Sequence, residues 1–248
     1  MKTSLTSLIF FISVYTSYCF NFANRFKVCQ RNDPELDACL ADAIERGFEL
    51  LGSSGLPALK VPSIDPLKVN QITIGAGTNA VNLVQNYFDA TISGLSKLKV
   101  KNAHFDFDKK ILSFISTHTK VKQDAKYDIN GKILVLPVYG KGDTTIIFDD
   151  AVLHHYIHFK EEIKNDQTYL KVIDYNGTLS VGKAHFDFQN LFNGDKVLGD
   201  NILRVINDNW MVIFEDVKEG IEKSFSQVFK AIATEFFSRI TLNTLIPN

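Results

Sequence analysis

A long apolar stripe near the C-terminus constrains this chain more than any other feature. Between residues 217 and 240, apolar side chains recur every three or four positions, which places them on one face of a single helix. At 1.5 Å per residue such a helix is about 30 Å long or more, so its apolar face needs a partner surface of similar length. The stripe consists of Val217, Ile221, Phe225, Val228, Phe229, Ile232, Phe236, Phe237 and Ile240.

The preceding 120 or so residues indicate that this partner is a β-sheet. Residues 67–188 contain short β-branched and aromatic runs separated by Gly, Asp, Asn and Lys, with no convincing long helix. Short connections favour an antiparallel meander, and the pairs Asn130-Gly131 and Asn176-Gly177 suit tight hairpin turns. The fold class is therefore α+β.

The tetrapeptide His-Phe-Asp-Phe occurs twice, at residues 104–107 and 185–188. In a strand the phenylalanines share one face, and the His and Asp side chains share the other. We favour this interpretation over a metal site, because polar alternation on the outer face is typical of half-buried strands. The phenylalanines then face the long helix.

The N-terminus has the pattern of a secretory signal peptide. In residues 1–19, Lys2 is followed by an apolar stretch and then by small side chains at Ser17 and Cys19, and Ala23 offers an alternative cleavage site. That stretch is too short to span a bilayer, and no other stretch is long and apolar enough. Hydrophobic residues make up 45% of the whole chain. Residues 20–248 are therefore enough to form one large domain or two small ones.

Charge excludes nucleic acid as a partner. Loss of Lys2 with the signal moves the formal net charge from −1 to about −2, and bases and acids are interspersed. Cys29 and Cys39 then remain in an oxidising compartment, where a disulfide is expected. Asn176 lies in the chain's Asn-x-Thr sequon and is a candidate glycosylation site.

A second, shorter helix is expected after Cys29. Asp33 is placed as its N-cap, Pro34 stands at the first helical position, and the helix ends at Gly52. Ser53 and Ser54 suit a C-cap and linker. Three prolines in residues 55–66 then predict an extended connector.

No catalytic or metal-binding motif stands out. The glycines of "ITIGAGTNA" lack the surrounding βαβ units of a dinucleotide site, so a turn or bulge is favoured. His154, His155 and His158 cannot all share one face of a strand, and a polar strand edge is the simpler interpretation. No Gly-x-Ser-x-Gly occurs, and no free thiol is expected, so neither an enzyme nor a metal or other cofactor is predicted.

A sheet curved around one helix often leaves an apolar tunnel. Strand parity and helical spacing select its expected lining, with Asp149 and Asp150 taken as the point where one strand leaves the core and Trp210 as an end closure. About half of this set is expected to pack only against itself. The set is Phe105, Phe107, Ile146, Phe148, Phe186, Phe188, Trp210, Phe225, Val228, Phe229, Ile232 and Phe236.

The stretch "NLFNGDKVLGDNILRVINDNW" resembles the takeout and juvenile hormone-binding protein family of insects. Supporting matches are "CQRNDPELDACL", "GLPALKVPSIDPL", "ISGLSKLKV" and "YDINGKILVLPVYGKG", which together cover essentially the whole mature chain. The resemblance implies a long C-terminal helix wrapped by a strongly curved antiparallel sheet, a tunnel for an isoprenoid or fatty-acyl ligand, and secretion into haemolymph or another extracellular fluid. It also implies that Cys29 and Cys39 form the family's N-terminal disulfide.

The chain departs from the hormone-binding members of that family, whose second disulfide it lacks. This places it on the takeout side and weakens the case for juvenile hormone as ligand. The motif residues 190–200 are interpreted as structural, at the junction of sheet and helix. Two functions follow: a secreted non-catalytic carrier of a small hydrophobic molecule, or a secreted signalling protein with a filled core that binds a protein partner.

Overall fold

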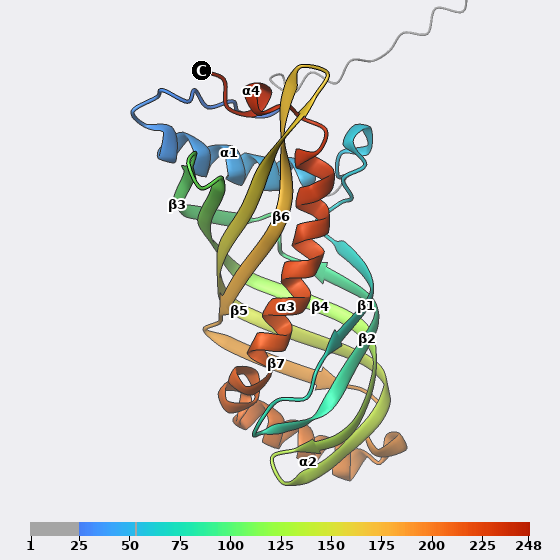
Figure 1. The fold of residues 1–248 in the computed structure, drawn as a ribbon. Coiled ribbons are helices and arrows are strands. Elements are labelled where there is room, and N and C mark those ends of the chain that lie inside the picture. Colours follow the sequence, from blue (N-terminus) through green and yellow to red (C-terminus); the bar gives the residue numbers. More distant parts are fainter. Residues whose placement is uncertain (1–24, 53) are drawn as a thin grey trace, which may run out of the picture.

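The computed structural model describes residues 25–52 and 54–248, so the predicted signal at residues 1–19 and Ser53 lie outside the described residues. A curled sheet runs along one long helix, with a further helix across each end of the molecule (Figure 1). The helices are α1 (Leu36–Leu51), α2 (Lys196–Asp208), α3 (Trp210–Phe237) and the short α4 (Leu242–Leu245). The strands are β1 (Leu67–Ile74), β2 (Val81–Ser93), β3 (Leu98–Asp106), β4 (Ile111–Ile133), β5 (Leu136–Lys164), β6 (Gln167–Ser180) and β7 (Lys183–Phe188).

Two exceptionally long strands organise the sheet. Within the described residues the sheet has seven strands in the order β1-β2-β4-β5-β6, while β3 pairs with β4 and β7 pairs with β5. Because β4 has 23 residues and β5 has 29, each is long enough to pair with different strands over its two halves. All pairings are antiparallel, and the sheet is open rather than closed.

Irregular backbone positions interrupt strands β2, β3 and β5. Asp89, Asn102 and Asp150 have positive φ, and the ladder register shifts next to the first two. Along β5 the buried face also changes parity, since Phe148 and Ala151 are both buried although they are an odd number of positions apart, with only Asp149 and Asp150 between them. The register shifts show one extra residue in β2 and one in β3, and an extra residue of this kind increases local twist and bends the strand.

Helix α3 lies between the two outer strands of the open sheet (Figure 1). On the β6 side, the backbone N–H of Gly177 donates to Ser226 Oγ at 3.0 Å, and Lys230 Nζ donates to the carbonyl of Ile173 at 2.6 Å. On the β1 side, Ser224 Oγ donates to the carbonyl of Thr73 at 3.2 Å. Side chains of the helix thus satisfy backbone groups that an edge strand would otherwise expose.

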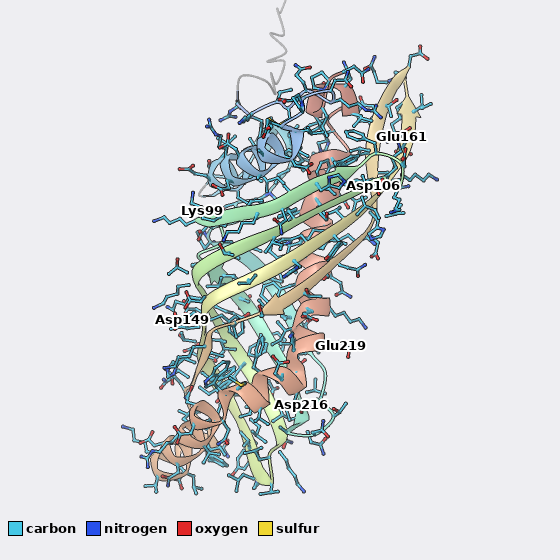
Figure 2. The ribbon with its side chains drawn as sticks, turned by 90° about the vertical axis from the view of Figure 1, so that its left-hand side faces the viewer. Lys99, Asp106, Asp149, Glu161, Asp216 and Glu219 are labelled. Atoms are coloured by element: carbon cyan, nitrogen blue, oxygen red, sulfur yellow. A yellow bond between two sulfur atoms is a disulfide. The ribbon has the colours of Figure 1, made fainter. Side chains whose placement is uncertain are left out.

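Charged side chains lie on the outside of the sheet, as the labelled Lys99, Asp149 and Glu161 show (Figure 2). Several form exposed ion pairs, such as Lys110 with Glu161 at 2.6 Å. Exposed pairs of this kind contribute little to stability, typically below about 1 kcal/mol each. The main stabilising contribution comes from the apolar core between the sheet and α3.

The predicted α+β class, the antiparallel sheet and the long C-terminal helix are confirmed, but both predicted hairpin turns are wrong. Asn130-Gly131 lies inside β4 and Asn176-Gly177 lies inside β6. The hairpin between β5 and β6 uses Asn165 and Asp166, which both have positive φ, as a two-residue turn of this kind requires. Long-range ladder pairing overrides the local turn preference of the Asn-Gly pairs.

Other local expectations also need correction. Helix α1 begins at Leu36 with Glu35 at the N-cap position, and Asp33, three positions before the helix, accepts a hydrogen bond from the N–H of Glu35 at 2.8 Å. Strand β5 does not leave the core at Asp149 but continues to Lys164. Helix α2 was not expected from the sequence; the Asp195 side chain caps it by accepting from the N–H of Leu198 at 3.1 Å.

Candidate functional site

The largest apolar cavity lies between α1, the C-terminal half of α3 and the sheet. Its volume is about 190 Å³. Helix α1 contributes Leu40, Ile44 and Phe48, and strands β3, β4 and β5 contribute Phe105, Leu112, Phe114 and Ile157. Helix α3 contributes Phe229, Ile232, Ala233, Phe236 and Phe237.

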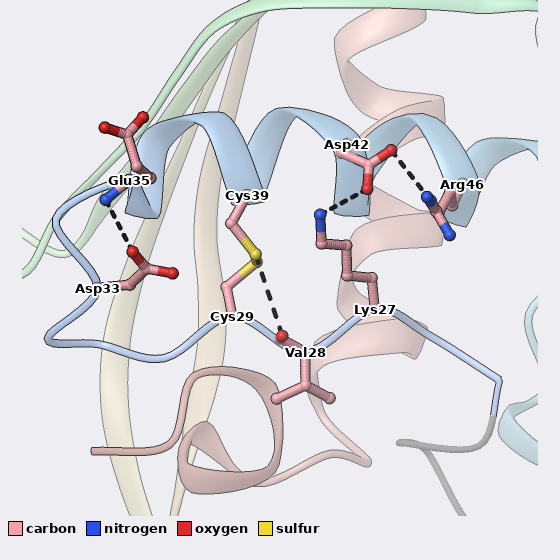
Figure 3. Close-up of a disulfide and its surroundings, with 8 residues drawn as sticks. All are labelled: Lys27, Val28, Cys29, Asp33, Glu35, Cys39, Asp42 and Arg46. Carbon is pink, nitrogen blue, oxygen red and sulfur yellow. Dashed lines mark hydrogen bonds and ion pairs between the residues drawn. A yellow bond between two sulfur atoms is a disulfide. The ribbon is translucent and has the colours of Figure 1, made fainter.

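A disulfide between Cys29 and Cys39 holds one wall of this large cavity (Figure 3). The pairing expected from the sequence is confirmed, and it ties the segment before α1 to the helix itself. Next to it, Asp42 accepts hydrogen bonds from Lys27 at 2.6 Å and from Arg46 at 3.0 Å. These two bonds, that from Lys27 first, hold the pKa of Asp42 below its ordinary value.

A second apolar cavity of about 50 Å³ lies further along α3, towards α2. Its walls come from β1, β2, β4, β5 and β7 as well as from both helices. The polar side chains at its margin are Gln85, Gln123 and Ser224.

The two cavities share no lining residue, and a third of about 30 Å³ shares lining residues with each of them. Phe148 and Phe225 line both the second and the third cavity, whereas Tyr175 and Phe229 line both the third and the large one. The core therefore contains a row of apolar cavities along α3, divided by aromatic side chains.

Most of the predicted lining residues surround these cavities. Phe105, Phe229, Ile232 and Phe236 border the large cavity, and Ile146, Phe148, Phe186, Phe188, Phe225 and Val228 border the second. Whether any of them contacts a ligand stays a prediction.

Phe107 and Trp210 are not among the residues that surround the three cavities. Phe107 follows the end of β3, where its ring packs 4.7 Å from that of Phe105 and lies 4.3 Å below the guanidinium of Arg31. Trp210 is the first residue of α3 and packs, partly buried, against the core.

The motif residues 190–200 and Asn207 join the sheet to the helices. The Asn190 side chain donates to the carbonyl of Lys141 at 2.8 Å. Asn207 accepts from the N–H of Phe186 and donates to its carbonyl, both at 2.8 Å. Asn207 therefore fixes α2 against β7, and Asn190 fixes the segment before α2 against β5.

The expected polar strand edge at the histidine cluster is wrong. Strand β5 pairs with both β4 and β6, and His155 is only 2% exposed, inside the core. Its Nε2 lies 2.8 Å from Ser116 Oγ and its Nδ1 lies 2.5 Å from the hydroxyl of Tyr175. Burial, and then the nearby His118 and His154, lower the pKa of His155 to about 3, so the ring is neutral at physiological pH.

Sequence reasoning missed two parts of this site. The sequence predicted the apolar face of α1, but the spacing of its residues did not indicate that this face lines a cavity through Leu40, Ile44 and Phe48. The inward position of His155 depends on the change of parity near Asp150, for which the sequence offers only a pair of aspartates. In residues 25–52 and 54–248, no group of three or more His, Cys, Asp or Glu side chains is placed to hold a metal ion.

Comparison with known proteins decides the family. The model of the family described as haemolymph juvenile hormone binding protein matches residues 6–247. The chain belongs to this family. It is also 27% identical over 227 residues to the circadian clock-controlled protein daywake of Drosophila melanogaster, covering 88% of this chain and 86% of daywake, and 26% identical to daywake of Drosophila yakuba with the same coverage.

The fold matches a solved member of the takeout group. The crystal structure of Takeout 1 from Epiphyas postvittana superimposes with a TM-score of 0.79 at 21% identity, covering 90% of this chain and 100% of Takeout 1. The recognition of the takeout and juvenile hormone-binding family from sequence motifs is therefore confirmed.

Among the described residues, no helix has the length and apolar character needed to cross a membrane. Asn176 is exposed on β6, opposite Tyr156 of β5, and its side chain donates to Asp174 at 2.9 Å. Its glycosylation stays a prediction.

Proposed function

We propose that this protein is a secreted, non-catalytic carrier that holds a small hydrophobic molecule in the large cavity between α1 and α3. Residues 1–19 act as the secretion signal, and residues 20–248 form one ligand-binding domain. The ligand is an isoprenoid, a fatty-acyl chain or a similar lipid.

The observation that carries this proposal is the size and chemistry of the large cavity. An engineered apolar cavity of about 150 Å³ is known to stay dry and to bind benzene. The cavity between α1 and α3 is larger, about 190 Å³, and aliphatic and aromatic side chains form almost all of its wall. Natural cores contain few voids larger than a water molecule, so a void of this size favours an occupant.

The energetics allow useful affinity. Burial of about ten carbon atoms at about 0.8 kcal/mol each contributes about 8 kcal/mol before the costs of ordering are subtracted. The resulting dissociation constant is of the order of micromolar or weaker for a ligand confined to this cavity. A ligand that also reached the second cavity would bind more tightly.

Family membership and the disulfide support the same function. The family's description names a haemolymph protein that binds juvenile hormone. The Cys29–Cys39 bridge fits an oxidising extracellular compartment. The alternative of a signalling protein with a filled core has less support, because the cavities leave the core unfilled along α3.

The test is direct binding by the lipid-stripped protein. Titration with a fluorescent fatty acid and with an apolar dye is expected to give saturable binding with a dissociation constant of the order of micromolar or weaker. Unlabelled fatty acid or farnesol is expected to displace both probes. Absence of saturable binding of every apolar probe would refute the carrier function. Turnover of an isoprenoid ester or epoxide that depends on His154, His155 or His158 would refute the non-catalytic assignment.

A further inference from the structure

Four aromatic side chains separate the large cavity from the smaller cavities along α3. We call this set the barrier: Phe225, Phe229, Tyr175 and His155. The rings of Tyr175 and Phe229 stack at 5.9 Å and an angle of 21°, and Phe225 and Phe229 stack at 6.2 Å. His155 meets both Tyr175 and Phe229 edge to face, at 6.0 and 6.2 Å. The barrier thus joins side chains from β5, β6 and α3.

A buried chain of hydrogen bonds connects the barrier to two residues of β4 and to the backbone of Gly94. Tyr175 bonds to His155, His155 bonds to Ser116, and Ser116 Oγ also lies 3.0 Å from His118 Nε2. The last link joins His118 Nδ1 to the carbonyl of Gly94 at 3.2 Å. Ser116 is fully buried and His118 is 3% exposed.

Apolar side chains would fill this space without needing polar partners. A buried hydroxyl or imidazole is tolerated only when it is hydrogen-bonded, and here each one is. The polar chain also fixes the orientation of the rings. The imidazole of His155 is held by stacking against Phe114, with ring centroids 4.2 Å apart, and its hydrogen bond to Tyr175 holds the hydroxyl end of that side chain. Tyr175 then supports the stacked ring of Phe229.

We propose that the Ser116–His155–Tyr175 chain is a positioning device that keeps the barrier closed and thereby limits the ligand to a length that fits the large cavity. The ligand class is a short apolar chain or a compact isoprenoid of about ten carbon atoms, judged from the volume of the cavity. This inference rests on the proposed carrier function. It names Tyr175 and Phe229 as the residues that set the length limit.

The cavity of about 30 Å³ that Tyr175 and Phe229 line gives the rings of the barrier space into which they can move. A ring released from its hydrogen bond has space to turn there. Removal of the Phe229 ring would join the large cavity to this one, and only Phe148 and Phe225 would then stand before the second cavity.

The test measures affinity against ligand length for saturated alcohols of about eight, twelve, sixteen and twenty carbon atoms. Each additional buried methylene strengthens binding about fourfold, whereas a methylene left in water adds nothing. For the native protein we expect affinity to rise and then level off near the length that fills the large cavity. In Tyr175→Phe and Phe229→Ala the levelling point is expected at a greater length, with binding of the sixteen-carbon alcohol strengthened about tenfold or more.

Tyr127→Phe is the matched control, because it removes a hydroxyl that donates to the carbonyl of Gln189 at 2.6 Å, away from the barrier. It is expected to lower the thermal midpoint without moving the levelling point. Phe229→Leu serves in place of Phe229→Ala if the latter does not fold.

Three results would overturn the inference. They are a native affinity that keeps rising to twenty carbons, a levelling point unchanged in both barrier variants, or an equal shift in Tyr127→Phe. A native protein that binds no alcohol of any length would refute the carrier function, and the length limit would fall with it.

Discussion

Asp216 of α3 accepts a hydrogen bond of 2.7 Å from the backbone N–H of Val81, at the start of β2 and 135 residues earlier in the chain. The same carboxylate accepts from the N–H groups of Thr78 and Asn79 at 3.1 and 2.9 Å. Gly77 passes so close that a Cβ there would collide with Asp216. The loop between β1 and β2, whose glycines suggested a turn in the sequence, is therefore an anchor for the long helix.

Replacement of Asp216 should loosen this anchor. Desolvation raises the pKa of Asp216, but the backbone donors outweigh it and hold the pKa below its ordinary value. Asp216→Ala leaves the N–H of Val81 without its partner, and we expect the free energy of unfolding to fall by about 1–3 kcal/mol. Urea denaturation measures the change. The exposed Glu219→Ala on the same helix is the control, with an expected change within about 0.5 kcal/mol.

The sequence predicted those features that depend on local periodicity. Helical spacing identified α3, and period-two alternation placed Phe186 and Phe188 on the inner face of β7. Alternation did not reveal the bends. Asp150, with positive φ, shifts the parity of β5, and this is why Asp149 was mistaken for an exit from the core and His155 for a surface residue.

The division of the core into separate cavities could not be predicted. It depends on how Phe225 and Phe229 of α3 meet Tyr175 of β6, some 50 residues away in the chain, after the sheet has curled. A filled core, a tunnel and a row of cavities produce the same apolar stripe. Only the packing distances between distant elements distinguish them.

Loss of the disulfide should weaken both the fold and the ligand site. Cys29 and Cys39 are ten residues apart, and closure of a loop of this length contributes about 2–3 kcal/mol by the chain-entropy estimate. We expect the double variant Cys29→Ser, Cys39→Ser to have a lower thermal midpoint and weaker dye binding, since Cys29 and α1 form part of the large cavity's wall. The native secreted protein should show no free thiol on alkylation under denaturing conditions. Labelling of both cysteines would contradict the bridge.

Stability should fall below neutral pH because of His155. Its pKa is about 3 when folded and about 6.5 when unfolded, so between these values the unfolded chain binds a proton that the folded protein does not. The contribution of His155 to the unfolding free energy is therefore fully present above about pH 6.5. It decreases as the pH falls towards 3, by at most about 1.4 kcal/mol per pH unit. Burial likewise lowers the pKa of His118, which acts in the same direction.

Urea denaturation between about pH 7 and pH 4.5 tests this slope, above the range where most carboxylates titrate. His155→Gln should be less stable at pH 7 but should have a shallower pH dependence. His185→Gln, at an exposed position on β7, should keep the native slope. Equal slopes in the native protein and in His155→Gln would show that this imidazole is not the group responsible.

Two tryptophan substitutions on the same face of α3 test which cavity holds the ligand, because a larger side chain blocks binding only where the ligand lies. Ile232 borders the large cavity of about 190 Å³, and Val228 borders the second cavity of about 50 Å³. Ile232→Trp has room for the larger ring, so we expect it to abolish dye binding while the thermal midpoint changes little. Val228→Trp must force its ring into a smaller space, and we expect it to lower stability by about 1–3 kcal/mol while binding is retained. The reverse pattern would mean that the ligand occupies the cavity nearer α2, and it would move the proposed site along the helix.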